Sequence, residues 1–171
     1  MQVDPLNNRT NKLIPYFVVD DSKAAVDFYV RVFDATDVKI MEYDGKVIHA
    51  ELTIGTDTIM LSDEMHEMLS AKSIGNTPVI MYLYVVDVDR VFNKAVELGA
   101  KIVMPIEDQF YGDRTGAFID PFGFKWTIAT HIVDLSSDTM MQNYEKMLEE
   151  HKYKQKYEKY KIKYHNIKQK N

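Results

Sequence analysis

The sequence predicts an α+β fold of two βαβββ modules whose sheets curve around one cavity, followed by a long charged C-terminal helix. Two observations carry this prediction. A β-rich run that leads into an amphipathic helical pattern occurs at 14–29 and again at 80–96, about 66 residues later. From Ser137 onward the chain has the composition of a single charged helix.

The sequence divides into five parts. A polar N-terminal arm (1–11) precedes the first module (12–64), a polar and partly helical linker (65–77) follows, and the second module (78–133) leads into a charged helix or tail (134–171). Hydrophobic residues make up 46% of the 171 residues, which is enough for two small modules to share a core.

The first module starts with a strand at 13–19 and a helix at 23–33, for which Ser22 is the expected N-cap. Asp44 and Gly45 predict a hairpin turn, because both residues tolerate positive φ. The helix carries one apolar stripe, formed by Ala25, Phe28, Tyr29, Val32 and Phe33. The remaining strands are expected at 37–43, 46–54 and 58–62.

The second module repeats this order from Ile80. Asp87 is expected to cap its helix and Gly99 to end it. The residues that this helix buries are Val88, Val91, Phe92, Ala95 and Val96. The remaining strands are expected near 101–105, 115–119 and 124–130, with a turn at 120–123 before the last one.

Composition excludes several classes of protein. The chain has no cysteine, which excludes disulfides, a thiolate nucleophile and cysteine-ligated metal. No apolar run approaches the roughly 20 residues needed to cross a bilayer. Because the N-terminus also lacks the apolar stretch of a signal peptide, we expect a cytoplasmic location.

The formal net charge of −5 is unevenly distributed. Residues 151–171 hold eight lysines and the single acid Glu158, a charge of +7, so the first 150 residues carry −12. An acidic body argues against sequence-specific DNA binding and leaves only residues 151–171 to contact a polyanion. A heptad-like seam runs along this segment through Tyr153, Tyr157, Tyr160, Tyr164 and Ile167. The segment is either a partner-binding helix or a solvated extension of the body.

Alternation along the strands predicts which side chains face the cavity. On the strand at 47–54, the face that packs under the helix comprises Ile48, Ala50, Leu52 and Ile54, and the opposite face comprises Val47, His49, Glu51 and Thr53. The first strands add aromatic walls with Tyr16, Tyr82 and Tyr84, whereas Trp126 is expected on the helix side as core. Such a mixed lining suits a small, partly apolar organic molecule.

His49 and Glu51 are the candidate catalytic residues. Two residues apart on one strand, they project from the same face and can form a hydrogen-bonded acid–base pair. In the alternative interpretation, each bonds a cross-strand neighbour on a polar sheet face. A metal ion held by the two would need a third ligand that the sequence does not show.

The segment 108–114 is dense in hydrogen-bonding groups around a glycine. At a cavity rim, Arg114 can pair with an anionic group of a ligand through its planar guanidinium. Alternatively, Asp113 and Arg114 pair with each other and fix the loop. The remaining histidines have no partner at ligand spacing and are expected on the surface: His66, His131, His151 and His165.

Five segments together resemble one known family. They are 14–21 (IPYFVVDD), 26–29 (VDFY), 49–52 (HAEL), 107–114 (EDQFYGDR) and 120–126 (DPFGFKW). In this order and spacing they resemble the vicinal oxygen chelate superfamily of glyoxalase I, bleomycin-resistance proteins and extradiol dioxygenases, and within it the PhnB-like proteins. The resemblance covers roughly residues 12–133.

The resemblance implies where a metal would be held. Metal-dependent members use four His or Glu ligands, and the corresponding positions here are Ile14, Met60, Ile80 and Thr127. These side chains do not suit a divalent ion, so no cofactor is expected at the usual positions. The resemblance also implies a homodimer, and it favours ligand-binding roles for Gln109, Tyr111 and Arg114.

Three functions remain open on this reasoning. The first is a glyoxalase/bleomycin-resistance-like protein that binds a small organic molecule without metal. The second is a lyase- or isomerase-type enzyme that uses His49 and Glu51 as an acid–base pair or as unusual metal ligands. The third is an interaction protein that acts through the basic segment 151–171.

Overall fold

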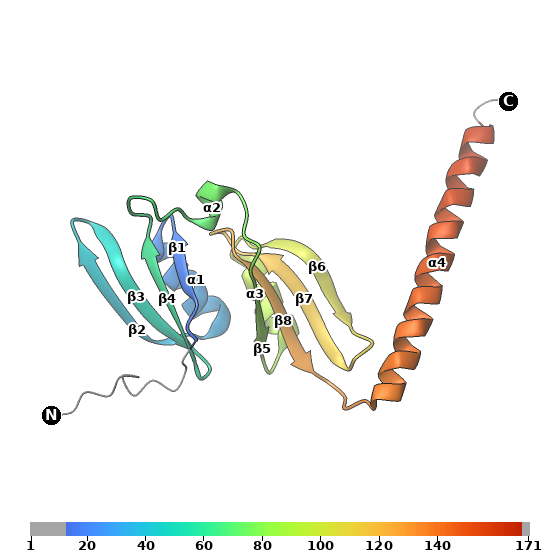
Figure 1. Ribbon diagram of the computed structural model, residues 1–171, viewed down its shortest axis with the longest axis horizontal. Coiled ribbons are helices and arrows are strands. Elements are labelled where there is room, and N and C mark those ends of the chain that lie inside the picture. The colour runs from blue at the N-terminus through green and yellow to red at the C-terminus, as the bar shows by residue number, and fades with distance from the viewer. Residues whose placement is uncertain (1–12, 169–171) are drawn as a thin grey trace. The chain divides into compact units, whose positions relative to one another are not determined.

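The computed structural model describes residues 13–168 and confirms two βαβββ modules followed by a long helix (Figure 1). The elements of the first module are β1 (Tyr16–Val19), α1 (Ser22–Phe33), β2 (Thr36–Tyr43), β3 (Lys46–Ile54) and β4 (Asp57–Asp63). A short helix α2 (Ala71–Ile74) lies in the linker. The second module consists of β5 (Ile80–Tyr84), α3 (Val88–Glu97), β6 (Lys101–Asp108), β7 (Asp113–Ile119) and β8 (Lys125–His131), and α4 (Ser137–Lys168) follows.

Each module forms its own four-stranded sheet, with the orders β1-β4-β3-β2 and β5-β8-β7-β6. In both sheets the first strand pairs in parallel with the last one, as β1 does with β4 and β5 with β8. The helix between the first two strands of each module is the crossover that this arrangement needs. The repeat detected in the sequence is therefore a structural repeat.

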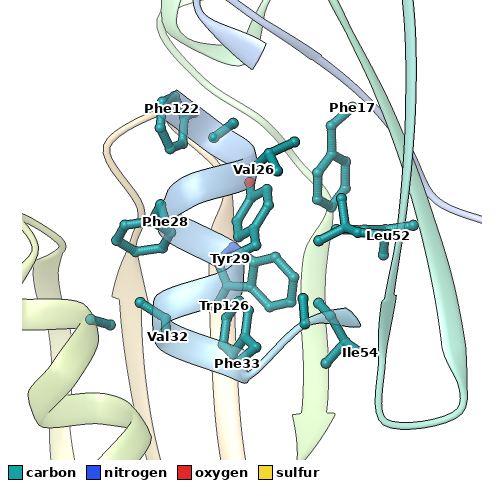
Figure 2. Packing of buried hydrophobic residues seen from close by; sticks show 14 of the residues in the cluster. Phe17, Val26, Phe28, Tyr29, Val32, Phe33, Leu52, Ile54, Phe122 and Trp126 are labelled. Atoms are coloured by element: carbon teal, nitrogen blue, oxygen red, sulfur yellow. The ribbon is translucent and has the colours of Figure 1, made fainter. Parts of the chain in front are cut away.

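The helix-side faces of the two sheets share one hydrophobic core around α1 (Figure 2). The predicted apolar stripe of α1 is buried along its whole length. Its Tyr29 lies among Phe17 of the first sheet and Phe122 and Trp126 of the second module. Phe17 also stacks on Phe124 with 4.2 Å between ring centroids. Burying each such ring contributes about 1.5–3 kcal/mol, so this core joins the two modules.

Asp120 anchors that core through four hydrogen bonds. Its Oδ2 accepts from Tyr29 Oη at 2.8 Å and from Trp126 Nε1 at 2.9 Å. Its Oδ1 accepts from the backbone N–H groups of Phe122 and Phe124 at 3.0 and 2.9 Å. Burial raises the pKa of the Asp120 carboxyl against the opposing effect of these bonds, and burial also raises the pKa of Tyr29 well above its usual range.

The predicted N-cap of α1 was wrong by one residue. Asp21, in an extended conformation, is the cap, and its carboxylate accepts from the Ala24 N–H at 3.0 Å. Ser22 is instead the first helical residue, and its own N–H donates to Asp63 Oδ1 at 2.8 Å, a partner from β4. The cap and the end predicted for α3 are confirmed: Asp87 accepts from the Arg90 N–H, and Gly99 follows the helix at φ 98°. Of the residues predicted to be buried on α3, Val96 is only partly buried.

The hairpin prediction is confirmed, and one strand prediction needs correction. Asp44 and Gly45 both have positive φ, at 50° and 75°. Val47, predicted to face away from α1, is instead buried at 2% exposure. The cause is a β-bulge, because Met41 pairs with His49 and Glu42 pairs with Val47, which leaves Ile48 as an extra residue. The bulge therefore exchanges the faces predicted for the residues of β3 before His49, and the alternation of faces from His49 onward is as predicted.

A second compact unit comprises residues 107–114 and the described residues from His131 onward. Within it, Gly112 accepts through its carbonyl from the N–H groups of Ile132 and Val133, at 3.0 and 3.1 Å. Asn143 of α4 donates to the Phe110 carbonyl at 3.2 Å, and Tyr144 packs against the Phe110 ring. These contacts hold the start of α4 on the turn between β6 and β7.

Farther along α4, Tyr153 and Tyr157 of the predicted seam are exposed. The side chains of Tyr160, Tyr164 and Ile167 lie outside the described part of the chain. None of the described helices has an apolar stretch long enough to span a membrane.

Candidate functional site

The face of the first sheet that points away from α1 carries the first group of candidate residues. The strand register aligns Tyr16 with Met60, Met60 with Glu51, and Glu51 with Lys39. Residues next to them in sequence, such as Phe17 and Leu52, are buried on the helix side. Tyr16 is 46% exposed, so this row of side chains is accessible from outside the core.

His49 and Glu51 contact each other on this face. His49 Nε2 lies 3.2 Å from Glu51 Oε1, and the Tyr16 ring lies 6.1 Å from the imidazole, measured between ring centroids. The Glu51 side chain is only 15% exposed, whereas that of His49 is 35% exposed. When Glu51 is ionised, Nε2 donates the hydrogen bond and Nδ1 carries the lone pair of the neutral imidazole. The pair therefore presents a basic nitrogen that a carboxylate supports.

The corresponding face of the second sheet is aromatic. Tyr82 pairs in register with Thr127, so both project from one face, and the rings of Tyr82 and Tyr84 are 5.4 Å apart. Tyr82 is 48% exposed and Tyr84 59% exposed. Trp126 points to the opposite side and is 2% exposed, which confirms its predicted place in the core.

The structure therefore brings together two separate groups: Tyr16, His49 and Glu51 on one sheet, and Tyr82, Tyr84 and Thr127 on the other. Both groups lie on the faces that the shared core leaves free, since the opposite faces of the two sheets pack around α1. Half-exposed aromatic side chains on a sheet face form a surface that a planar organic molecule or another protein surface can cover.

Three further candidates lie in the second unit: Gln109 and Tyr111 on the turn between β6 and β7, and Arg114 at the start of β7. Arg114 Nη1 lies 2.7 Å from Asp108 Oδ1, and Gln109 Nε2 donates to the Glu107 carbonyl at 3.3 Å. The Tyr111 ring packs perpendicular to Phe110. Asp108 is thus a partner of Arg114 that was not predicted from the sequence. An anionic group of a ligand would compete with Asp108 for Arg114.

The surroundings of His131 escaped prediction. Its ring lies between two carboxylates, with Nδ1 2.7 Å from Asp113 Oδ1 and Nε2 2.9 Å from Asp134 Oδ1. Hydrogen bonds to Asp113 and then to Asp134 raise the pKa of His131 above its usual 6.5. The His131–Asp134 spacing was visible in the sequence, but Asp113 is brought to the ring by the fold.

The resemblance predicts metal ligands at four positions, and the side chains there are Ile14, Met60, Ile80 and Thr127. Met60 lies in register with Tyr16, and Thr127 with Tyr82. A thioether and one hydroxyl, with Ile14 and Ile80 at the other two positions, give no imidazole or carboxylate donor. Over residues 13–161, no group of three or more histidines and carboxylates converges in a way that could hold a metal ion.

Comparisons with known proteins identify the relatives of this chain. The model of the Glyoxalase/Bleomycin resistance protein/Dioxygenase superfamily matches residues 10–128. An uncharacterized protein of Mycobacterium bovis is 42% identical over 132 residues, which cover 74% of this chain and 87% of that protein.

Solved structures give the same result for the fold. TioX of Micromonospora sp. ML1 is 28% identical with a TM-score of 0.57, covering 70% of this chain and 98% of that one. The PhnB protein of Bacillus cereus is 20% identical with a TM-score of 0.55, covering 70% and 99%. At that identity, the likeness to PhnB is evidence for the fold alone.

Proposed function

Because this chain belongs to the Glyoxalase/Bleomycin resistance protein/Dioxygenase superfamily, we propose that it binds a small, partly apolar organic molecule on its tyrosine-bearing sheet faces, without a divalent metal. The observation that carries the proposal is the cluster on the first sheet, where the Tyr16 ring lies beside the hydrogen-bonded pair of His49 and Glu51. An exposed aromatic surface next to a few polar groups is typical of small-molecule sites.

The chemistry of the two faces defines the ligand class. Tyr16, Tyr82 and Tyr84 offer ring faces for stacking, and their hydroxyl groups can bond a polar edge. His49 and Glu51 add an acceptor and a negative charge at one end of the first face. A planar or aromatic molecule that carries a hydrogen-bond donor or a positive charge fits this combination.

The proposal includes a homodimer. In one chain the two candidate faces point away from the core that they share around α1, so each leaves its tyrosines half exposed. A second copy that lays its Tyr82 face over the Tyr16 face of the first would enclose the ligand between them. If the first copy also lays its Tyr82 face over the Tyr16 face of the second, the two contacts are equivalent and the dimer has two-fold symmetry.

We propose ligand binding without a metal because of the side chains at the four positions where metal ligands are predicted. The side chains at the four positions offer no ligand that binds a hard or borderline divalent ion well. Specific recognition then depends on the tyrosines, Thr127 and the His49–Glu51 pair. Within the second unit, Gln109, Tyr111 and Arg114 are proposed separately as ligand contacts, for which Arg114 must exchange Asp108 for an anionic group.

A second candidate function is a lyase- or isomerase-type enzyme. The distance of 3.2 Å between His49 Nε2 and Glu51 Oε1 favours it, because a carboxylate at this distance holds the imidazole in one orientation. In that case His49 takes a proton from the substrate through Nδ1 and returns it to a neighbouring atom of the substrate.

A third candidate, polyanion binding through residues 151–171, is favoured by the charge of +7 and by the exposed Tyr153 and Tyr157.

Ligand binding can be tested on full-length protein after treatment with a chelator. We expect members of a library of small aromatic compounds to raise the melting temperature of the metal-free protein. Tyr16→Ala and Tyr82→Ala should abolish this shift, whereas Tyr43→Ala, which removes an exposed tyrosine from the end of β2, should preserve it. Stabilisation that requires added Zn²⁺ or Mg²⁺, or that survives both site substitutions, would refute the proposal.

The same samples separate binding from catalysis. Turnover of a stabilising compound that is lost in both His49→Ala and Glu51→Ala would establish the enzyme. Binding without turnover would leave the protein as a binding protein. Sedimentation of the wild type and of Tyr82→Ala tests the dimer, and a wild type that stays monomeric at high concentration would contradict this part of the proposal.

A further inference from the structure

A pocket of about 310 Å³ lies at the end of the second module where β8 begins. It is lined by α2, by the turn between α3 and β6, and by the turn between β7 and β8. No candidate residue named above lines this pocket. Lys125 lies two residues before Thr127 on the same strand, so the pocket lies beyond the end of the second aromatic face.

Three lysines line the pocket: Lys72, Lys101 and Lys125. They are a third of the nine lysines that precede residue 151, in a part of the chain that carries a net charge of −12. Lys101 makes no ion pair with any residue that the structure describes, and Lys125 donates to an amide oxygen rather than to a carboxylate. Positive charge is therefore concentrated here against the overall charge of the body.

Asn76 adds a neutral donor. Its Oδ1 accepts from Lys125 Nζ at 3.0 Å and from the Thr77 N–H at 2.9 Å. With the oxygen occupied twice, the NH₂ group of the side chain has no acceptor among the residues described in the structure. The amide also holds the Lys125 ammonium at the pocket wall.

The carboxylates nearby do not neutralise the three lysines. Asp120 lines the pocket, but it is 3% exposed and both its oxygens bond donors of the core. Asp20 pairs with Lys72 at 2.6 Å, where the two side chains are 34% and 58% exposed. An ion pair so exposed to water is held weakly, so a ligand can compete for Lys72.

Glycines form part of the pocket lining. At Gly99 an added Cβ would lie 3.8 Å from the Pro121 ring, on the pocket wall. At Gly123 it would lie 3.1 Å from the backbone nitrogen of Lys72 and 3.3 Å from Ala71 Cβ. Gly123, at φ 92°, therefore suits the close approach of α2, which carries Lys72, to the turn that precedes Lys125.

We propose that this pocket binds an oxyanion of the phosphate type, free or carried by a small organic molecule. Three ammonium groups and an amide donor without a nearby free carboxylate match a group with two negative charges and several acceptor oxygens. The volume equals that of about ten liquid waters, which leaves room for an organic portion beside the apolar walls of Ile119 and Pro121. This site is independent of the proposed function of the sheet faces.

The test uses full-length protein and calorimetric titration with inorganic phosphate, pyrophosphate and phenyl phosphate at constant ionic strength. We expect saturable binding of at least one of these anions by the wild type. The double variant Lys101→Gln/Lys125→Gln should bind about tenfold more weakly or worse, because it loses two hydrogen bonds to a charged group. Since both lysines are at the surface, circular dichroism should show that the variant is folded.

The basic C-terminal segment is the competing binding site, and it provides the matched control. Lys152→Gln/Lys156→Gln removes the same charge from α4 and should bind the anion as the wild type does. Tighter binding of phenyl phosphate than of phosphate would identify an organic carrier, and equal binding would identify the free ion. Absence of saturable binding, or a loss of binding in the α4 variant but not in the pocket variant, would overturn the proposal.

Discussion

The buried carboxyl of Asp120 offers the sharpest test of how the two modules are held together. Asp120→Asn keeps the shape of the side chain and one acceptor oxygen. If that oxygen stays with the backbone N–H groups of Phe122 and Phe124, the new NH₂ group faces Trp126 Nε1 and Tyr29 Oη. The indole nitrogen can only donate, so Trp126 loses its acceptor, whereas the tyrosine hydroxyl can rotate and accept.

The expected cost follows from these contacts. A buried donor left without an acceptor costs about 1–3 kcal/mol, and the two remaining backbone bonds weaken when the acceptor loses its charge. The relief of a buried charge offsets part of this loss, since burial raises the pKa of Asp120. We expect Asp120→Asn to lower the free energy of unfolding by about 2–3 kcal/mol. Tyr29→Phe removes one bond and leaves three donors on Asp120, so it should cost about 1 kcal/mol.

The assay is urea unfolding of full-length protein, followed by the fluorescence of Trp126, the only tryptophan in the chain. Tyr16→Phe, which removes an exposed hydroxyl, is the control and should change stability by less than about 0.5 kcal/mol. If Asp120→Asn proves as stable as the wild type, or less destabilising than Tyr29→Phe, the view that Asp120 joins the modules through Tyr29 and Trp126 is wrong.

Three further outcomes can be checked. Gly116→Ala should lower the free energy of unfolding by about 1–3 kcal/mol, because the new Cβ would lie 2.8 Å from the Phe92 ring. This loss of stability should be smaller in a Phe92→Leu background. Equal losses in both backgrounds would contradict the contact. The pKa of His131, followed by NMR, should lie above 6.5. Because folding raises this pKa, the contact of the His131 ring with the two carboxylates contributes fully to stability below pH 6.5. That contribution is lost as the pH rises through the pKa of the folded protein. Asp134→Asn should move that titration downward, and an unchanged midpoint would refute the role of this carboxylate. Hydrogen bonds from Ser73 and Ser70 lower the pKa of Glu64 to about 2, so the contribution of Glu64 to stability is present above pH 4.5 and lost as the pH falls through about 2. Because Glu64 accepts from the N–H of Ser70, the N-cap of α2, Glu64→Gln should increase amide exchange in α2 at neutral pH. Exchange like that of the wild type would argue against this contact.

Local patterns in the sequence were sufficient for the fold. The stripe on α1, the Asp87 cap, the Asp44–Gly45 turn and the core position of Trp126 each depend on residues a few positions apart. Their conformational preferences act within one element, so the prediction needed no knowledge of distant neighbours. The same holds for the shared face of His49 and Glu51, which follows from strand alternation alone.

The features that escaped prediction depend on partners far along the chain. Asp63 accepts the Ser22 N–H from 41 residues away, and Asp113 reaches His131 across 18 residues. The bulge that buries Val47 depends on the register against β2. The lysine pocket gathers its charges from three separate elements. The sequence by itself determined the two modules and the faces of their strands, because periodicity is local; only the tertiary structure decided which distant charges and hydrogen-bonding groups meet, because chain folding sets those distances.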